Sequence, residues 1–256
     1  MQKKLVILGC GSSVGVPRID GVWGNCKKTN LKNYRTRCSA LIIKGSNSIL
    51  IDTSPDIRNQ LLDNKIKNIT SVIYSQQHAD QTNGLFELRP FFWKNKKKID
   101  IFGNQNTISD LKKRYDYLFK KFDSYPPIVK SNIIKSKFSL GSSSEKVFFK
   151  TFSVKHGPTT SVVYIFENTA YISDSNDLSI VNVKMLKNLK YLILDCLKFK
   201  KHPTHYNFDE ALFIHSKLKP KKTILTNLHH DMDYDYLLRN LPKNVLPAYD
   251  GLKLNL

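Results

Sequence analysis

The feature that most constrains this sequence is a recurring pattern in which a short apolar run stops at side chains able to bind a metal. The first example is the segment YSQQHADQTNG (residues 74–84), which follows the apolar run 71–74. Such runs predict β-strands that present ligands at their carboxyl ends. The polar groups placed in this way are Gln76, His78, Asp80 and Gln81; His156; Asp174; and Asn227, His229 and His230. If those strand ends converge, they form the kind of cavity that a hydrolytic metal centre requires.

Each of these groups alone also has a simpler interpretation. A single His after a strand is more often a hydrogen-bonded structural residue, and an Asp in that place is more often a helix cap. The joint placement of the groups therefore carries the prediction.

The remaining pattern predicts one α+β domain over residues 1–256. Strands are predicted at 4–8, 40–44, 48–51, 71–74, 99–102, 147–154, 161–166, 170–172, 191–194 and 223–225, and helices at 55–62, 107–118, 178–186 and 208–218. No linker rich in Pro, Gly or Ser divides the chain. Strands grouped before and between helices in each half predict two β-sheets packed face to face with helices outside, a four-layer αβ/βα sandwich.

The net charge and the cysteines bear on the ligands of the protein and on its cellular compartment. The formal net charge of +20 would concentrate phosphate-bearing ligands near the protein, although solvated surface lysines also explain it. Cys10, Cys26, Cys38 and Cys196 are scattered, as is typical of thiols in a reducing compartment. No stretch approaches the ~18 apolar residues needed to cross a bilayer, so we expect a cytoplasmic protein without a membrane partner.

A resemblance covers almost the whole chain. It is carried by LGCGSSVGVP (8–17), NYRTRCSALI (33–42), ILIDTSPDIRNQLL (49–62), HADQTNGLFELRP (78–90), KHGPTTSVVYIF (155–166), AYISD (170–174), HPTHYNFDEAL (202–212), LTNLHHDMDYD (225–235) and AYDGL (248–252). These segments resemble the metallo-β-lactamase fold superfamily, in the branch similar to phosphoribosyl 1,2-cyclic phosphate phosphodiesterase and, more distantly, ribonuclease Z. The resemblance implies the metallo-β-lactamase fold.

The resemblance also implies a set of metal ligands, three of which are replaced by amides in this chain. The family motif H-x-H-x-D-H falls on Gln76, His78, Asp80 and Gln81, and the later ligands fall on His156, Asp174 and Asn227. A first metal would have His78, His156 and Asp174 with the amide Gln76, a set that suits zinc, manganese or iron. A second would have only oxygen ligands from Asp80, Gln81, Asp174 and Asn227, so we expect this site to be weak or empty.

Other roles follow from the same resemblance. His205 is expected to be the general acid or a phosphate contact, Asp80 to orient the attacking water, and Asp52 to hold a ligand loop through hydrogen bonds. Arg35 and Arg37 could contact phosphate or stabilise the site from behind. His202, His215 and His229 are expected to be structural. Only Cys26 and His230 match the structural zinc site of some branches, so we expect no structural zinc.

The function implied is hydrolysis of a cyclic or other small phosphodiester. One alternative is a pseudoenzyme or binding module, because the three amides could mark a site that was inactivated naturally or deliberately. The other is ribonuclease Z-like RNA processing, since RPFFWKNKKK (89–98) alternates aromatic and basic residues that could stack on RNA. The oligomeric state is left open, with a homodimer among the options.

Overall fold

The strands form two sheets of seven in the computed structural model, which describes residues 3–141, 145–177 and 183–256. In spatial order, the first sheet contains β14 (Leu252–Asn255), β1 (Lys3–Gly9), β2 (Ser39–Lys44), β3 (Asn47–Ile51), β4 (Ser71–Ile73), β5 (Ile99–Gly103) and β6 (Val129–Ile133). The second contains β13 (Val245–Pro247), β12 (Lys222–Thr226), β11 (Tyr191–Asp195), β10 (Thr169–Ile172), β9 (Thr159–Phe166), β8 (Val147–His156) and β7 (Lys137–Leu140).

Both sheets change from antiparallel to parallel pairing. Strands β3 to β6 are parallel in the first sheet, as are β10 to β13 in the second. The carboxyl ends of parallel strands meet at one edge of a sheet, where open α/β sheets usually bind their ligands. The predicted ligands lie just beyond such ends, except His156, which is the last residue of the antiparallel strand β8.

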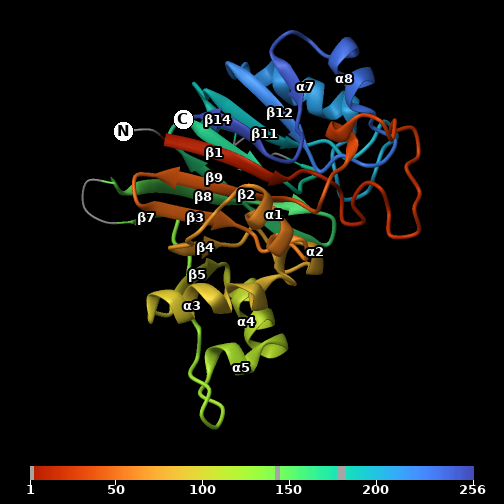
Figure 1. Cartoon of the computed structure of the whole chain (residues 1–256). Helices are drawn as coiled ribbons and strands as arrows, with labels where there is room; N and C mark the ends of the chain where they lie inside the picture. The colour runs from red at the N-terminus through yellow and green to blue at the C-terminus, as the bar shows by residue number, and fades with distance from the viewer. Residues whose placement is uncertain (1–2, 142–144, 178–182) are drawn as a thin grey trace.

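Helices cover the two outer faces (Figure 1). On the first sheet these are α1 (Ile57–Asp63), α2 (Ala79–Thr82), α3 (Arg89–Asn95), α4 (Gln105–Arg114) and α5 (Asp116–Phe119), and on the second α7 (Phe208–Leu218) and α8 (Tyr234–Asn240). Short 3-10 turns are η1 (Leu31–Asn33), η2 (Leu85–Leu88) and η4 (Lys184–Leu186). None of the described helices is long and apolar enough to span a bilayer.

The core follows from side-chain alternation along the strands. In β1, Leu5 and Ile7 join the cluster between the sheets, whereas Val6 and Leu8 join the cluster beneath the first sheet's helices. A third cluster lies beneath α7 and α8. The layers are therefore helix, sheet, sheet and helix, which confirms the predicted four-layer αβ/βα sandwich.

The predicted helix over residues 107–118 is wrong in its continuity. The structure has α4 and α5, separated at Tyr115, whose backbone leaves the helical region with φ of −128° and ψ of 40°. The hydroxyl of Tyr115 and the guanidinium of Arg114 both donate to Asn83 Oδ1, so contacts to the residue that follows α2 accompany the break. The predicted helix 178–186 lies partly outside the described residues, and the elements that were not predicted include β6, β13, β14, α2, α3 and α8.

Candidate metal centre

Asp52 joins two strand ends beneath the site. It follows β3 with φ of 63°, a left-handed conformation that Asp and Asn adopt more readily than most residues. Its carboxylate accepts hydrogen bonds from the backbone N–H and the hydroxyl of Ser75, both at 2.7 Å. Burial raises the pKa of Asp52 well above its usual value, while the bonds from Ser75 lower it. Asp52 thereby fixes the end of β4, from which the segment containing Gln76 and His78 begins.

The segment after β4 places its polar side chains in different environments. Gln76 is 1% exposed, and neither its amide oxygen nor its nitrogen has a hydrogen-bond partner among the described residues. His78 is exposed, and its ring lies 5.2 Å from that of His156 between centroids. Asp80, in α2, has a pKa raised to about 6 by burial and by the neighbouring charge of Asp174. The structure thus brings Gln76, His78 and Asp80 to the same end of the molecule as His156 and Asp174.

The amide of Gln81 lies between two carboxylates. Its Nε2 atom is 3.1 Å from Asp174 Oδ2 and 3.2 Å from Asp80 Oδ2, and it donates to both. Its Oε1 atom is buried without a hydrogen-bond partner among the described residues. A neutral N–H donor therefore neutralises part of the repulsion between the two acids, a task that a cation would otherwise perform.

His156, Asp174 and His205 form the tightest ligand group. Their ligand atoms all lie within 4.8 Å of one another, and His156 and Asp174 are 4% and 2% exposed. The Nδ1 atom of His156 lies 2.8 Å from the carbonyl oxygen of Thr204, to which it donates, so its Nε2 atom keeps a free lone pair. This geometry groups His205 with the predicted ligands, although the sequence reasoning gave it the role of an acid.

Asp195 is a functional candidate that the sequence reasoning missed. It is fully buried after the apolar residues of β11, the same signal that singled out Asp174 after β10. Its Oδ2 atom accepts from His205 Nδ1 at 2.7 Å and from the Ser175 N–H at 3.0 Å, while Oδ1 accepts from Asn227 Nδ2 at 3.0 Å. Because His205 Nδ1 donates to Asp195, the 3.1 Å approach of Asn227 Nδ2 to that nitrogen brings two donors together.

The charge state of His205 follows from its neighbours. Burial opposes the imidazolium, yet the pKa of His205 is raised to about 9 because Asp195, Asp174 and Asp80 favour the positive charge. Burial raises the pKa of Asp195, and His205 opposes that rise. The pair therefore retains the proton on His205 at neutral pH.

The donor set fits one metal ion better than two. The free lone pair of His156, the carboxylate of Asp174 and the unpartnered buried amide of Gln76 suit an ion beside them, with His78 at its open side. At the second position, the nitrogen atoms of Gln81 and Asn227 already bond to carboxylates. An amide nitrogen cannot serve as a ligand in that protonated form.

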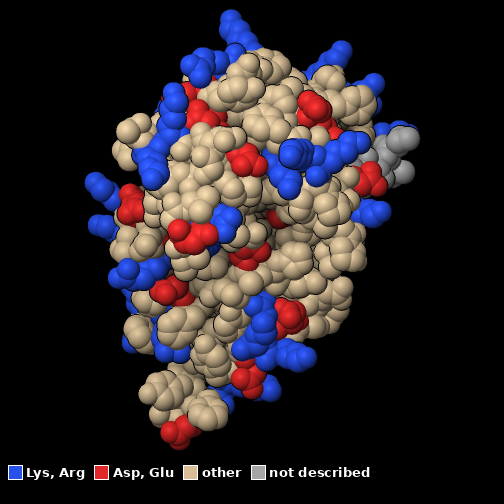
Figure 2. Space-filling view, turned by 90° about the vertical axis from the view of Figure 1, so that its right-hand side faces the viewer, with Lys and Arg blue, Asp and Glu red and all other residues tan. Residues whose placement is uncertain are grey.

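Two cavities open above this group. A cavity of about 210 Å³ is lined by residues that include His202, His205 and Lys198, and a pocket of about 550 Å³ adjoins it. They share Ser13, Val14, Asp80 and His229. Figure 2 shows this face hollowed at its centre, with acidic atoms inside the hollow and basic side chains around it.

The other predicted residues have distinct surroundings. Arg35 is 1% exposed and donates to the carbonyl oxygen of Met232 at 2.7 Å, a structural position, whereas Arg37 lines the larger pocket. His215 bonds to Thr223 Oγ1 at 2.8 Å. His229 and His230 lie in the larger pocket's wall and, with Asp231, form a second group of close ligand atoms. The sequence pattern indicates the two histidines but not Asp231. Cys26 Sγ lies 3.7 Å from the guanidinium of Arg35.

Comparisons with known proteins agree with the fold. The model of the beta-lactamase superfamily domain matches residues 47–229. A solved structure, a new diphosphatase from the PhnP family, is 32% identical, with a TM-score of 0.91 over 100% of this chain and 98% of that chain. Zn²⁺-bound PqqB from Methylobacterium extorquens, with a TM-score of 0.77 over 99% and 100% of the two chains, and human tRNase Z, short form, with 0.70 over 98% of each, are both 16% identical and share the fold.

A curated relative extends beyond this chain. An octanoyltransferase of Porphyromonas gingivalis is 27% identical over 253 residues, which make up 98% of this chain and 51% of that protein. The chain thus spans about half the length of the curated relative that it matches. The family match over residues 47–229 and the full-length identity to the diphosphatase show that the chain belongs to the metallo-β-lactamase superfamily, in its PhnP-like branch.

Proposed function

We propose that this chain is a metal-dependent hydrolase of a cyclic or other small phosphodiester. The observation that carries the proposal is the convergence of His156, Asp174 and His205 beside a cavity, with His205 held by the buried carboxylate of Asp195. The solved relative described as a diphosphatase supports phosphoryl chemistry at this site. The buried thiols of the four cysteines support a reducing compartment such as the cytoplasm.

We propose one metal position, for zinc or manganese, formed by His78, His156, Asp174 and the amide of Gln76. The ion's contribution when bound would be to polarise a phosphoryl oxygen and lower the pKa of water. A second position, at Asp80 and Asp174 with Gln81 and Asn227, is proposed to be weak or empty. The amide nitrogen of Gln81 donates to Asp80 and Asp174, and that of Asn227 donates to Asp195.

Two side chains of this chain are proposed to transfer protons during hydrolysis. His205 is protonated at neutral pH, and its Nδ1–H is committed to Asp195, so the Nε2–H remains to bond a phosphate oxygen or protonate the leaving group. Asp80 lines the same cavity, and its pKa of about 6 leaves it largely ionised at pH 7, where it can orient water and accept its proton.

The size and charge of the cavity favour a small substrate. At about 210 Å³ it suits a phosphoryl group with a small organic group, and Lys198, His202 and His205 supply positive charge or N–H donors. RNA processing remains a second enzymatic candidate, because Trp93 on α3 is 56% exposed beside Lys94 and residues 96–98, which are all lysines.

A binding module is the non-enzymatic candidate. The hydrogen bonds of Gln81 and Asn227 to acids supply its specific observation, because they satisfy the site without a second cation. Such a module would bind a phosphorylated ligand or one metal ion without turnover.

The test combines metal content with turnover. Metal-free protein is incubated with Zn²⁺ or Mn²⁺, freed of excess ion and analysed by elemental mass spectrometry, and hydrolysis of bis(4-nitrophenyl) phosphate is then measured. We expect about one ion per chain and metal-dependent hydrolysis that His205→Gln reduces by roughly 10²–10⁴-fold. His215→Gln, on α7, is the matched control that should retain activity. Bound metal without hydrolysis would favour the binding module, and the absence of both would overturn the proposed metal site.

A further inference from the structure

We propose that the 550 Å³ pocket beside the smaller cavity is a subsite for a planar heterocycle, such as a nucleobase, carried by the phosphodiester substrate. Ile19 and Arg37 are its specificity-determining residues. This inference rests on the proposed hydrolase function and specifies the organic part of its substrate.

The two cavities form one continuous cleft. Asp80, Ser13, Val14 and His229 line both, so a ligand with its phosphoryl group beside His205 can extend past Asp80 into the larger pocket. A phosphoryl group with a small sugar would leave most of this space empty. About 550 Å³ lies within the usual range for pockets that bind drug-sized organic ligands.

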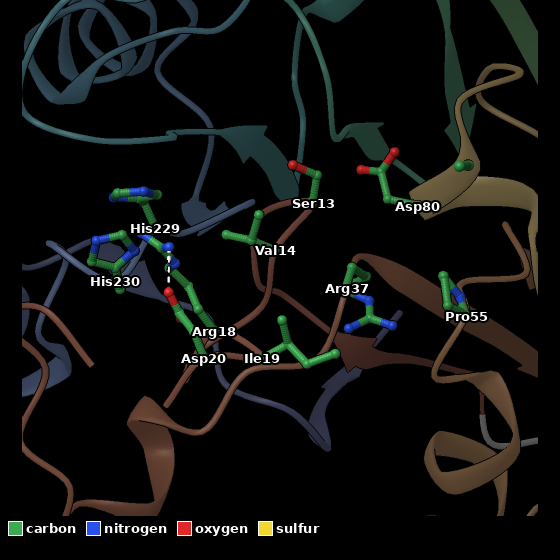
Figure 3. A pocket seen from close by; sticks show the side chains of 11 residues that line it. Ser13, Val14, Arg18, Ile19, Asp20, Arg37, Pro55, Asp80, His229 and His230 are labelled. Atoms are coloured by element: carbon green, nitrogen blue, oxygen red, sulfur yellow. Dashed lines mark hydrogen bonds and ion pairs between the residues drawn. The ribbon is translucent and has the colours of Figure 1, made fainter. Parts of the chain in front are cut away.

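The pocket has an apolar surface open to solvent. Val14, Ile19, Pro55 and Ala79 contribute to its lining, and the side chains of Val14 and Ile19 are 46% and fully exposed. Figure 3 shows Val14 and Ile19 standing beside Arg37, with Asp80 farther along the pocket. Apolar side chains exposed together at the mouth of a cleft gain free energy when a ligand covers them.

The arginines of the pocket suit stacking better than binding a second phosphate. Arg18 is paired with Asp20 at 2.5 Å and Arg37 with Asp56 at 2.9 Å, so carboxylates already neutralise both guanidinium groups. The pairing also limits the orientations of the guanidinium planes, and a guanidinium plane packs well on an aromatic ring. An apolar surface flanked by such planes selects a flat, weakly charged group.

Two substrates that differ only in the organic group provide the test. Thymidine 5′-(4-nitrophenyl phosphate) and methyl 4-nitrophenyl phosphate have the same reacting diester. In both, Asp80 accepts a proton from water, the water oxygen bonds to phosphorus, the bond from phosphorus to the nitrophenyl oxygen breaks, and 4-nitrophenolate leaves. With Mn²⁺-loaded protein we expect kcat/KM to be at least roughly tenfold higher for the thymidine ester.

Two variants test whether the preference for the thymidine ester arises in the larger pocket. Ile19→Asp places a charge on the apolar surface and should remove most of the preference for the thymidine ester. Leu31→Asp changes another exposed aliphatic side chain, 85% exposed on η1 and outside the pocket lining, and should keep the wild-type preference. Equal reaction of the two esters, or an unchanged preference in Ile19→Asp, would overturn the subsite.

A binding measurement distinguishes failure of the proposed subsite from failure of the proposed hydrolase function. If neither ester is hydrolysed, the hydrolase proposal fails, and calorimetric titration with thymidine 5′-monophosphate then decides the subsite. Binding that Ile19→Asp weakens at least about fivefold and Leu31→Asp leaves unchanged supports the subsite, whereas no binding, or equal binding by both variants, overturns it.

Discussion

At the scale of single residues, the amides determine how many metal ions we expect. Gln81 Nε2 and Asn227 Nδ2 donate to Asp174 and Asp195, whereas an imidazole in either place could offer a lone pair. We therefore predict that Gln76→His, Gln81→His and Asn227→His together raise the metal content from about one ion per chain toward two. Asn227→His alone should strengthen the second position more than the first.

Elemental mass spectrometry after equilibration with Zn²⁺ checks this prediction. His215→Gln serves as a control for general effects of altering histidine content, because His215 bonds to Thr223 away from the cleft. A triple variant that binds no more metal than the unchanged chain would show that these positions are not ligand positions.

A second prediction at this scale concerns the proton on His205. In the metal-free protein, Asp195→Asn should lower the pKa of His205 from about 9 toward its ordinary value of about 6.5, because the nearest compensating charge is lost. Since the folded-state pKa is raised, the protonated pair stabilises the fold fully below about pH 6.5, and this contribution is lost as the pH rises through 9. NMR titration of the imidazole signals checks the shift, and an unchanged His205 pKa in the variant would contradict it.

The sequence could identify polar residues that follow an apolar strand. It could not identify most of the side chains that contact those residues in the fold. His156 and Asp174 follow from this pattern, whereas His205 follows from the family resemblance, and the three lie together. Asp195 was missed although it also ends a strand, because no motif drew attention to it and its partner comes from a distant loop. The donor orientation of Gln81 could not be predicted either, since it depends on two acids brought close only by folding.

At the scale of elements, Asp52 couples β3 to β4. We predict that Asp52→Asn lowers the free energy of unfolding by about 1–3 kcal/mol. The neutral amide forms weaker hydrogen bonds than a carboxylate, and its NH₂ group can be satisfied only if the hydroxyl of Ser75 turns to accept. Asn keeps the volume and tolerates the left-handed backbone, so the change isolates the hydrogen bonds. Metal affinity should also fall by about 10–100-fold, since the ligand segment begins directly after Ser75.

Urea denaturation and metal titration measure these two effects. The control is Asp63→Asn, an exposed acid at the end of α1. If the Asp52 variant equals this control in both stability and metal affinity, the proposed coupling of the two strand ends is incorrect.

Element predictions succeeded where periodicity was clear and failed where tertiary contacts intervened. Helix α7 has the bounds predicted, 208–218, and begins with a capping box between Asn207 and Glu210. The helical pattern of 107–118 continued through Tyr115, but the structure interrupts the helix there, where Arg114 and Tyr115 contact Asn83. Strands β13 and β14 are short, and their pairing with distant strands supplies the order that their own sequence does not specify.

At the scale of the whole molecule, the site depends on both sheets. Asp52 and the 76–81 segment follow strands of the first sheet, whereas His156, Asp174, Asp195 and Asn227 end or follow strands of the second. The inner faces of the sheets share one apolar cluster, and the hydroxyl of Tyr164 on β9 donates to the carbonyl oxygen of Tyr74 after β4 at 2.7 Å. We therefore expect the sheets to unfold together, as one cooperative domain.

Phe149 on β8 allows this expectation to be tested. It is 1% exposed in the cluster between the sheets, with ring centroids 5.0 Å from Phe138 and 5.7 Å from Phe166. Phe149→Ala should lower the free energy of unfolding by about 3–5 kcal/mol through lost burial and the cavity that remains. Its neighbour Phe148 is 69% exposed, so Phe148→Ala is the matched control and should have little effect.

The readout should come from the opposite sheet. In a Trp23→Phe background, Trp93 on α3 is the remaining tryptophan and reports on the helices packed against the first sheet. If the chain is one cooperative domain, Phe149→Ala shifts the Trp93 fluorescence transition and the far-ultraviolet circular dichroism transition by the same amount. A Trp93 transition that stays at its original denaturant concentration would divide the chain into separately folding halves, and the site between them would then form only when both are folded.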